Sequence, residues 1–268
     1  MYWLKVWEVP SGSRGSRGRP IVNMFPLQPG EKITVVLPLT GEFRSFPADH
    51  YVFMCTALGV VKKTPLDDFS NPRKAGIIAV TLDEGDVLIG AALTDGQHDV
   101  MLFSDGGKAV RFDEGDVTAH GRQARGVKGM TLDEGQNVIA MLVAEDETQS
   151  VLTATENGYG KRTSIVEYTR HGRGTKGMIA IQQTERNGRV VAATLVRPAD
   201  EIMLITDKGV LVRTRVSEIR ELGRATQGVT LIALDNGTKL SGLQRIVEND
   251  APTDTEDNAG SEPGLEGN

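Results

Sequence analysis

The sequence predicts an all-β protein made of propeller-like blades in a ring or an open spiral, and three observations lead to this prediction. A glycine followed four residues later by a cation recurs at steps of about fifty residues. The intervening segments are short, rich in Val, Ile, Leu and Thr, and separated by Gly, Asp and Asn, which is typical of strands and hairpins. No stretch of the repeated region keeps a helical apolar period over about twelve residues. Regular repeats of this length, with about four strands each, are typical of propeller blades.

Each full repeat is expected to begin with a hairpin that turns at its glycine. The aligned segments are "CTALGVVKKT" (55–64), "FSDGGKAVRF" (103–112), "ATENGYGKRT" (154–163) and "ITDKGVLVRT" (205–214), which align Gly59 and Lys63 with Gly107 and Arg111, Gly158 and Arg162, and Gly209 and Arg213. Each repeat then reaches a second glycine preceded by basic residues, as in "GRQARGVKG" (121–129). It closes with a turn and an apolar strand, as in "LDEGQNVIAMLV" (132–143).

The repeats divide the chain into an array and a tail. We expect residues 1–247 to form the array, with units at about 2–39, 53–94, 101–144, 151–196 and 202–246. The first unit matches only the later part of a repeat, so the chain is expected to start inside one. Residues 248–268 carry seven acids and no Lys or Arg, which predicts a disordered acidic tail. This tail either serves solubility or competes with an anionic partner for basic sites.

The net charge of −6 hides a nearly neutral array, because residues 1–247 hold 30 bases against 29 acids. No apolar stretch is long enough to span a membrane, and the N-terminus lacks the pattern of a signal peptide. The single Cys55 is expected to be a buried small apolar side chain, as suits a reducing compartment. We therefore expect a cytoplasmic protein.

The cations of the array recur at the same phase of each repeat, so they are expected to form a basic band around its perimeter. Acids gather instead at the turn that follows, as in Asp83 and Asp133. Together with the cations of the hairpins, the predicted DNA-binding residues are Arg14, Arg17, Arg19, Lys63, Arg73, Lys74, Arg111, Arg122, Arg125, Lys128, Lys161, Arg162, Arg170, Arg173, Lys176, Arg213, Arg220 and Arg224.

A basic band around a disc suits a long polyanion that must bend. Duplex DNA carries a phosphate charge about every 1.7 Å of helix axis, and its neutralisation releases counterions whatever the base sequence. Glycines beside the arginines let the backbone approach phosphate oxygens. Because aromatic residues make up only 5% of the chain, stacking on single strands is not the expected mode. The spacing therefore predicts that duplex DNA wraps around the array.

Several segments resemble the C-terminal domain of the A subunit of bacterial DNA gyrase. They are "YWLKV" (2–6), "RGRPIVN" (17–23), "VKKT" (61–64), "NGYGKRT" (157–163) and "LVRTRVSEI" (211–219), and the similarity covers residues 2–247. The family carries a box, Gln-Arg-Arg-Gly-Gly-Lys-Gly, in its first blade. The nearest match here is Gln123, Ala124, Arg125, Gly126, Val127, Lys128 and Gly129, a degenerate copy in a middle repeat. The true box is expected before Met1.

The resemblance implies a six-bladed β-pinwheel, closed or spiral, whose blades exchange strands and whose first blade is incomplete here. It also implies a DNA-wrapping part of an ATP-dependent type IIA topoisomerase, with positive wrapping that lets the whole enzyme introduce negative supercoils. The implied partners are duplex DNA, the N-terminal part of the same polypeptide, and the ATPase subunit in an A2B2 assembly, in the bacterial cytoplasm at the nucleoid. ATP and Mg are implied for the whole enzyme, and no cofactor for this domain, which is expected to be monomeric alone.

No catalytic or metal-binding residue is expected in this chain. The four histidines lie in separate units without an H-x-x-x-H pair, and one cysteine excludes a thiolate metal site. The segment "GRGTKGM" (172–178) lacks the pattern of a phosphate-binding loop. By resemblance, the DNA-cleaving tyrosine belongs to another part of the gyrase polypeptide. Tyr159, between two glycines, is a candidate for a DNA contact.

Two other functions compete with gyrase. The C-terminal domain of topoisomerase IV is similar but usually has fewer blades and weaker basic turns. A protein-interaction propeller would need W-D or G-G signatures in each blade, whereas the two tryptophans, Trp3 and Trp7, both lie in the partial first unit.

Overall fold

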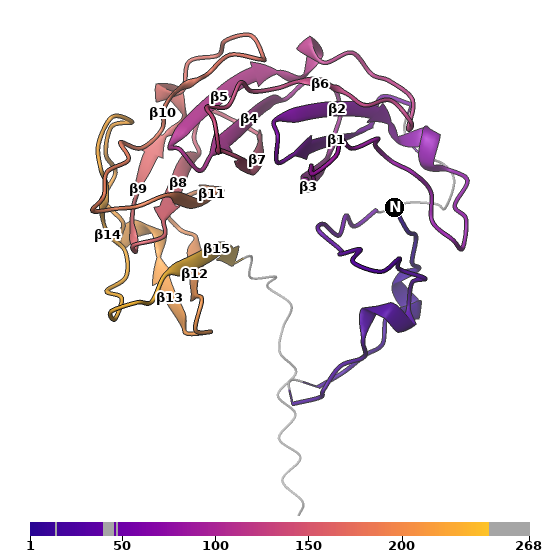
Figure 1. Ribbon diagram of the computed structural model, residues 1–268, viewed down its shortest axis with the longest axis horizontal. Coiled ribbons are helices and arrows are strands. Elements are labelled where there is room, and N and C mark those ends of the chain that lie inside the picture. The colour runs from indigo at the N-terminus through magenta and orange to yellow at the C-terminus, as the bar shows by residue number, and fades with distance from the viewer. Residues whose placement is uncertain (14, 40–45, 47, 247–268) are drawn as a thin grey trace, which may run out of the picture.

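The computed structural model describes residues 1–13, 15–39, 46 and 48–246. Arg14 and the predicted tail, residues 248–268, lie outside the described residues. Four antiparallel sheets follow one another along an open arc, with the N-terminal segment across a gap from the last sheet (Figure 1). The prediction of an all-β, propeller-like array is confirmed. The count of six blades stays a prediction.

The sheets are built from three full strands each, and a short fourth strand completes the first three. Their orders are β3 (Leu88–Thr94), β1 (Tyr51–Thr56), β2 (Val60–Pro65) and β6 (Val127–Lys128); β10 (Met178–Ile179), β5 (Lys108–Asp113), β4 (Asp99–Ser104) and β7 (Val138–Ala144); β11 (Val190–Val196), β8 (Ser150–Thr155), β9 (Tyr159–Ser164) and β14 (Val229–Thr230); and β13 (Leu211–Arg215), β12 (Glu201–Thr206) and β15 (Leu240–Ile246).

Within the described part of the chain the helices are all short 3-10 turns. They are η1 (Val6–Glu8), η2 (Ile21–Asn23), η3 (Leu66–Phe69), η4 (Glu114–Asp116), η5 (Ile165–Glu167) and η6 (Val216–Glu218). In each full repeat one such turn follows the outer full strand and ends its hairpin. None of these helices is long and apolar enough to cross a membrane.

The fourth strand of each completed sheet comes from the next repeat. β6 pairs with β2 across Val60 and Val61, although β6 lies more than sixty residues further along the chain. β10 and β14 pair in the same way with β5 and β9. The exchange of strands between neighbouring blades, which the family resemblance implied, is therefore confirmed. Figure 1 shows β6, β10 and β14 on the outer side of the arc and β3, β7, β11 and β15 on the inner side.

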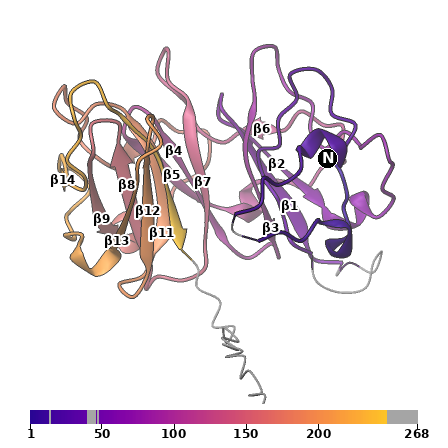
Figure 2. The same ribbon diagram turned by 90° about the horizontal axis from the view of Figure 1, so that it is seen from below.

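The predicted hairpins are present and turn at their glycines. Gly59, Gly107, Gly158 and Gly209 all have φ near +80° (+81°, +79°, +81° and +80°), a conformation that costs a glycine nothing. Seen from below, several strands run nearly upright side by side, so the turns gather above and below the strands, on the two opposite faces of the arc (Figure 2).

The hydrophobic core lies between neighbouring sheets rather than inside any one of them. In β4, Val100 and Leu102 pack with Phe53 of the first sheet, whereas Met101 and Phe103 pack with Val151 of the third. Both faces of a middle sheet are thus covered, which explains why all six residues of β4 are buried. The last sheet has no following neighbour among the described residues. Its Ile205, Val210 and Leu211 are accordingly 41%, 53% and 58% exposed.

One glycine per repeat makes the strand exchange possible. Gly126, Gly177 and Gly228 immediately precede β6, β10 and β14, and all have positive φ. A Cβ atom on these glycines would lie 2.6, 2.3 and 2.6 Å from a carbonyl oxygen of the sheet that the strand joins. The last glycine of "GRQARGVKG" (121–129) aligns by sequence with Gly177 of "RHGRGTKG" (170–177), but the strand pairing makes Gly126, rather than Gly129, the equivalent of Gly177. Gly129 itself has ordinary φ, but its Cβ would meet Val61 at 2.6 Å.

We predict that Gly177→Ala destabilises the protein much more than Gly135→Ala. Both glycines have positive φ (+74° and +72°), but a Cβ at Gly135 would meet open space. Both substitutions cost about 1–2 kcal/mol for the left-handed backbone. Gly177→Ala should cost about 1–3 kcal/mol more, because the fourth strand must move away from Ala109. Denaturant unfolding of both variants measures the difference, and equal losses would contradict the close-approach argument.

Candidate nucleic-acid interface

The predicted basic band lies on the segments that carry the exchanged strands. We call residues 70–78, 118–128, 169–179 and 220–230 the crossover segments. The last three each begin beside the end of an outer full strand, where the main-chain N–H of His120, His171 and Leu222 donates to the carbonyl of residues 63, 111 and 162. They return antiparallel beside the start of the same strand. The first crossover segment likewise meets the N-terminus, where the Met1 amine and the Ile77 carbonyl lie 2.8 Å apart.

Successive crossover segments are also hydrogen-bonded to one another. Gly174 N–H donates to the Gly129 carbonyl at 2.6 Å, and the Thr131 hydroxyl donates to the Gly174 carbonyl at 2.7 Å. Arg173 donates through Nη1 to the Lys128 carbonyl at 3.1 Å, and the equivalent Arg224 donates to the Ile179 carbonyl at 3.0 Å. The outer side of the arc is therefore one continuous band of backbone, which we call the rim.

Eleven of the predicted DNA-binding residues are exposed, and eight of these lie on the crossover segments. The exposed ones are Arg17, Arg19, Arg73, Lys74, Arg125, Lys128, Arg170, Arg173, Lys176, Arg213 and Arg220, whereas Arg122, Arg162 and Arg224 are half-buried. Among the residues that the structure describes, seven members of the exposed set have no carboxylate within ion-pair distance: Arg17, Arg19, Arg73, Lys74, Lys128, Arg173 and Arg220. Arg173 is bonded to main-chain carbonyls instead. On the crossover segments, Arg73, Lys74, Lys128 and Arg220 therefore offer the least encumbered positive charge for an anionic partner.

Other rim cations are paired with the acidic turns. Arg125 forms an ion pair with Asp83, and Lys176 lies 2.6 Å from Asp133 of the preceding repeat. Hydrogen bonds from Lys176 and Lys108 lower the pKa of Asp133. Basic band and acidic turns are thus adjacent rather than segregated, and these two ion pairs tie the second and third crossover segments to the repeat before them.

The structure corrects the prediction for three cations, Lys63, Arg111 and Lys161, which are buried. Lys63 donates through Nζ to the main-chain oxygen of Glu114 at 2.9 Å. Lys161 donates to the main-chain oxygens of Gly223 and Arg224. In each case the N–H donors of one repeat hold backbone carbonyls of the next, so these side chains join neighbouring repeats and do not face a partner.

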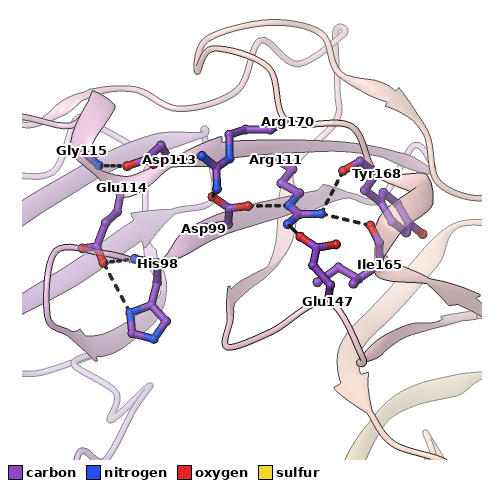
Figure 3. A network of polar contacts seen from close by, with 10 residues as sticks. All are labelled: His98, Asp99, Arg111, Asp113, Glu114, Gly115, Glu147, Ile165, Tyr168 and Arg170. Atoms are coloured by element: carbon purple, nitrogen blue, oxygen red, sulfur yellow. Dashed lines mark hydrogen bonds and ion pairs between the residues drawn. The ribbon is translucent and has the colours of Figure 1, made fainter.

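Arg111 shows this role most fully (Figure 3). Its Nε lies 2.7 Å from Asp99, and its Nη1 donates to the carbonyls of Ile165 and Tyr168, each at 3.2 Å. The other terminal nitrogen pairs with Glu147. Burial by itself would lower the pKa of Arg111, but the hydrogen bonds to Glu147 and Asp99 outweigh it and raise that pKa. One guanidinium therefore joins the second sheet to the 3-10 turn of the third.

Sequence reasoning missed a third buried lysine, Lys62, that also donates to backbone carbonyls. Lys62 donates to the main-chain oxygens of Ala79, at 2.8 Å, and Arg122, which is equivalent to the contact of Lys161 with Arg224. Desolvation lowers the pKa of both Lys62 and Lys161 to about 8. The adjacent lysines of "VKKT" were the available signal, since only one of two neighbouring strand residues can face outwards.

The degenerate box forms the end of the crossover segment that completes the first sheet. Gln123, Arg125 and Lys128 are exposed, Ala124, Gly126 and Val127 are half-buried, and Gly129 is buried. Its residues 127 and 128 are β6. The glycines therefore serve the strand exchange, and the exposed cations are what the box offers to a partner.

The remaining singled-out residues are distributed around the array. Tyr168 and Cys55 are buried, as expected for structural side chains. The Tyr159 ring is half-buried beneath the Arg186 guanidinium, 4.6 Å from the ring centroid. Sequence reasoning also missed that His98 lies beside Asp95 and Glu114, whose ligand atoms fall within 4.8 Å of one another.

A protein-family comparison matches almost the whole described array. The family described as DNA gyrase C-terminal domain, beta-propeller, matches residues 1–40, 50–95, 98–145, 149–197 and 200–246.

Curated relatives and solved structures give the same result. The chain is 53% identical over 257 residues to the DNA gyrase A protein of Klebsiella oxytoca and 51% identical over 257 residues to that of Escherichia coli K12. Each alignment covers 96% of this chain but only 28% of the relative. A structure of a DNA gyrase A C-terminal domain matches with TM-score 0.75 and 27% identity, covering 87% of this chain and 76% of the other. A topoisomerase IV C-terminal domain matches with TM-score 0.79 and 26% identity, covering 85% and 70%.

We predict that Arg111→Met lowers the free energy of unfolding by about 3 kcal/mol. The substitution removes the donor of two carbonyls and of Asp99 Oδ2, although Asp99 Oδ1 keeps its ion pair with Arg170 at 2.7 Å. Arg213 is the matched control, since it occupies the same position in the last repeat. Its side chain is 49% exposed and pairs with Glu201, so Arg213→Met should cost less than about 1 kcal/mol. Denaturant unfolding of both variants tests this, and similar losses would show that Arg111 does not join the sheets.

A second prediction concerns the pH dependence of stability. Lys161 has a pKa of about 8 in the folded chain, below its unfolded value, so between pH 8 and about 10 the unfolded state binds more protons. The free energy of unfolding of the wild type, measured relative to Lys161→Met, should therefore rise as pH increases through this window. The comparison cancels every other titrating group. A flat or falling difference would mean that Lys161 is not desolvated.

Proposed function

Because the chain belongs to the DNA gyrase C-terminal domain family, we propose that its rim binds duplex DNA and bends it around the array. The observation that carries this proposal is the continuity of the rim. The second, third and fourth crossover segments are bonded in series, as by Arg173 to the Lys128 carbonyl and by Arg224 to the Ile179 carbonyl. Lys62 bridges the second segment to Ala79, which directly follows the first. Each of the four segments bears at least one exposed cation. The exposed charge therefore follows the outer curve of the arc from sheet to sheet.

The physical requirements of wrapping match this arrangement. Bending a short stretch of duplex costs several kcal/mol, about 1–6 kcal/mol for a site of 20–30 base pairs, which a row of phosphate contacts can offset. A curved band that is already folded supplies these contacts without a further loss of conformational entropy on binding. The close backbone at the crossover glycines also leaves room for phosphate oxygens to approach main-chain N–H groups. Nothing in this scheme reads base sequence, so binding should be largely sequence-independent.

The activity of the whole protein is a further part of the proposal, since the chain spans about three tenths of the length of its gyrase relatives. We propose that it acts as the wrapping domain of a bacterial, cytoplasmic type IIA topoisomerase. The isolated domain would be a monomer. Positive wrapping would present DNA so that the assembled enzyme introduces negative supercoils. The catalytic tyrosine, the ATP and Mg chemistry, and the ATPase subunit of an A2B2 assembly would lie outside this chain.

A second candidate, the corresponding domain of topoisomerase IV, is favoured by one observation, the TM-score of 0.79 to such a domain. The two solved domains do not separate the candidates, at 27% and 26% identity. The family match and the curated gyrase A relatives, which reach 53% identity, favour gyrase. Wrapping separates the two: ligation of a nicked circle with the protein bound, followed by removal of the protein, should leave positive linking-number changes if the domain wraps DNA as proposed.

We predict that replacing Arg73, Lys74 and Lys128 by alanine weakens DNA binding without unfolding the array. The slope of log K against log salt should become shallower by roughly 0.9 for each phosphate that the variant no longer neutralises. The matched control replaces Arg189, Lys208 and Lys239, exposed cations at or beside the hairpin turns, and should leave the slope nearly unchanged. Binding isotherms across a salt series measure both, with circular dichroism as the folding check. An unchanged slope in the rim variant would count against this interface.

A further inference from the structure

We propose that Asp95, His98 and Glu114 form a binding site for a divalent transition-metal ion such as Zn²⁺ at the junction of the first and second sheets. Asp95 and His98 lie in the linker from β3 to β4, and Glu114 begins η4. His98 Nδ1 lies 2.8 Å from Asp95 Oδ1 and 3.7 Å from Glu114 Oε1. One imidazole nitrogen and two carboxylate oxygens are a donor set that Zn²⁺ and its first-row neighbours accept.

The strongest observation is that Glu114 is a buried carboxylate at a position where other repeats bury an aliphatic side chain. The equivalent residues are Leu66, Ile165 and Val216, as the shared hydrogen bond from their main-chain N–H to the linker before the hairpin shows. All of them are at most 3% exposed, and Glu114 is 0% exposed. A buried carboxylate costs several kcal/mol that an aliphatic residue does not, so packing alone does not account for Glu114.

The neighbouring repeat supplies an internal contrast. His50 occupies the position of His98 in the first sheet, but the 3-10 turn beside it begins with Leu66. The buried acid therefore occurs in the repeat whose linker brings a histidine and Asp95 to the same point. This co-occurrence is what a binding site requires and what packing does not.

The geometry around the three ligands is prepared for an ion. Glu114 is oriented by Thr94, whose hydroxyl donates to Oε2 at 2.7 Å, and by the His98 main-chain N–H, which donates to Oε1 at 2.9 Å. Such second contacts hold a ligand in place. A single proton on His98 Nδ1 serves one carboxylate at a time, whereas a bound ion would take the Nδ1 lone pair and both carboxylates together. Figure 3 shows His98 turned toward Glu114.

The site is also open to solvent on one side. The side chains of His98 and Asp95 are 30% and 39% exposed, so an ion can enter and water can complete its coordination. The Lys63 ammonium donates to the main-chain oxygen of Glu114. An ion here would fix the linker to η4, which already contacts the first sheet through Lys63, and would hold the spacing between the first two sheets.

The test is a titration of the full chain with Co²⁺, followed by visible absorption, and with Zn²⁺, followed by thermal unfolding. We expect one saturable site, ligand-field absorption from cobalt, and a rise in Tm with zinc through binding to the folded state. His98→Gln and Glu114→Leu should each weaken binding by roughly tenfold or more. Glu114→Leu should still fold, because Leu66 fills the same position in the first sheet.

The control is His120→Gln, an exposed histidine whose Nδ1 contacts the Thr118 carbonyl, and it should bind the ion as the wild type does. Absence of a saturable site would overturn the proposal. So would unchanged affinity in both folded site variants, or an equal loss in His120→Gln. These readouts need no DNA and no enzymatic activity, so they stand apart from the test of wrapping.

Discussion

The array depends on one steric requirement, which is that a glycine in each exchanged crossover segment must lie close to a carbonyl oxygen of the preceding sheet. With no Cβ at Gly126, Gly177 or Gly228, the chain can turn with positive φ and add two residues to the edge of a sheet that it has already left. Each of the first three sheets is therefore completed from the next repeat, so neighbouring repeats depend on one another for their structure. The same turn brings the basic residues before it to the outer side of the arc, so rim and fold have one cause.

The burial of cations is the second consequence of this linkage. When a crossover segment loops beyond a sheet edge, its carbonyls need donors in a place that water does not reach. Lys62 and Lys161 supply them from the outer strands, and Arg111 does so for the 3-10 turn of the next repeat. Desolvation makes these lysines expensive, since their pKa falls to about 8. Val110 occupies the same strand position in the second sheet, which shows that the crossover can also close over an apolar residue.

Sequence periodicity predicted the repeat, the hairpins at Gly107 and Gly209, and the cations of the rim, because these features depend on local spacing. It could not separate Lys63 and Arg111 from truly exposed cations. A cation copied at every repeat serves equally well to bind a phosphate or to hold a neighbouring carbonyl, and only the non-local pairing decides. The short fourth strand of each completed sheet could not be predicted for the same reason, since two residues such as Val127 and Lys128 are too few to show a strand pattern. The sequence did carry a signal for the cluster at Glu114, because this acid occupies a position that is aliphatic in the other repeats.

The nearly neutral array is compatible with binding a polyanion because some of its acids are buried and paired, whereas many of its cations are exposed along the rim. Salt limits the reach of exposed charges to about 8–10 Å, and acids such as Asp99, buried beside Arg111, are already paired, so they do little to a phosphate at the surface. Acids such as Asp83 and Asp133 lie closer and neutralise part of the rim at Arg125 and Lys176. Among the described residues no acid pairs with Arg73, Lys74 or Lys128, so the positive charge of these rim residues is the least neutralised. The strength with which DNA is held should therefore vary from sheet to sheet although the backbone track is continuous.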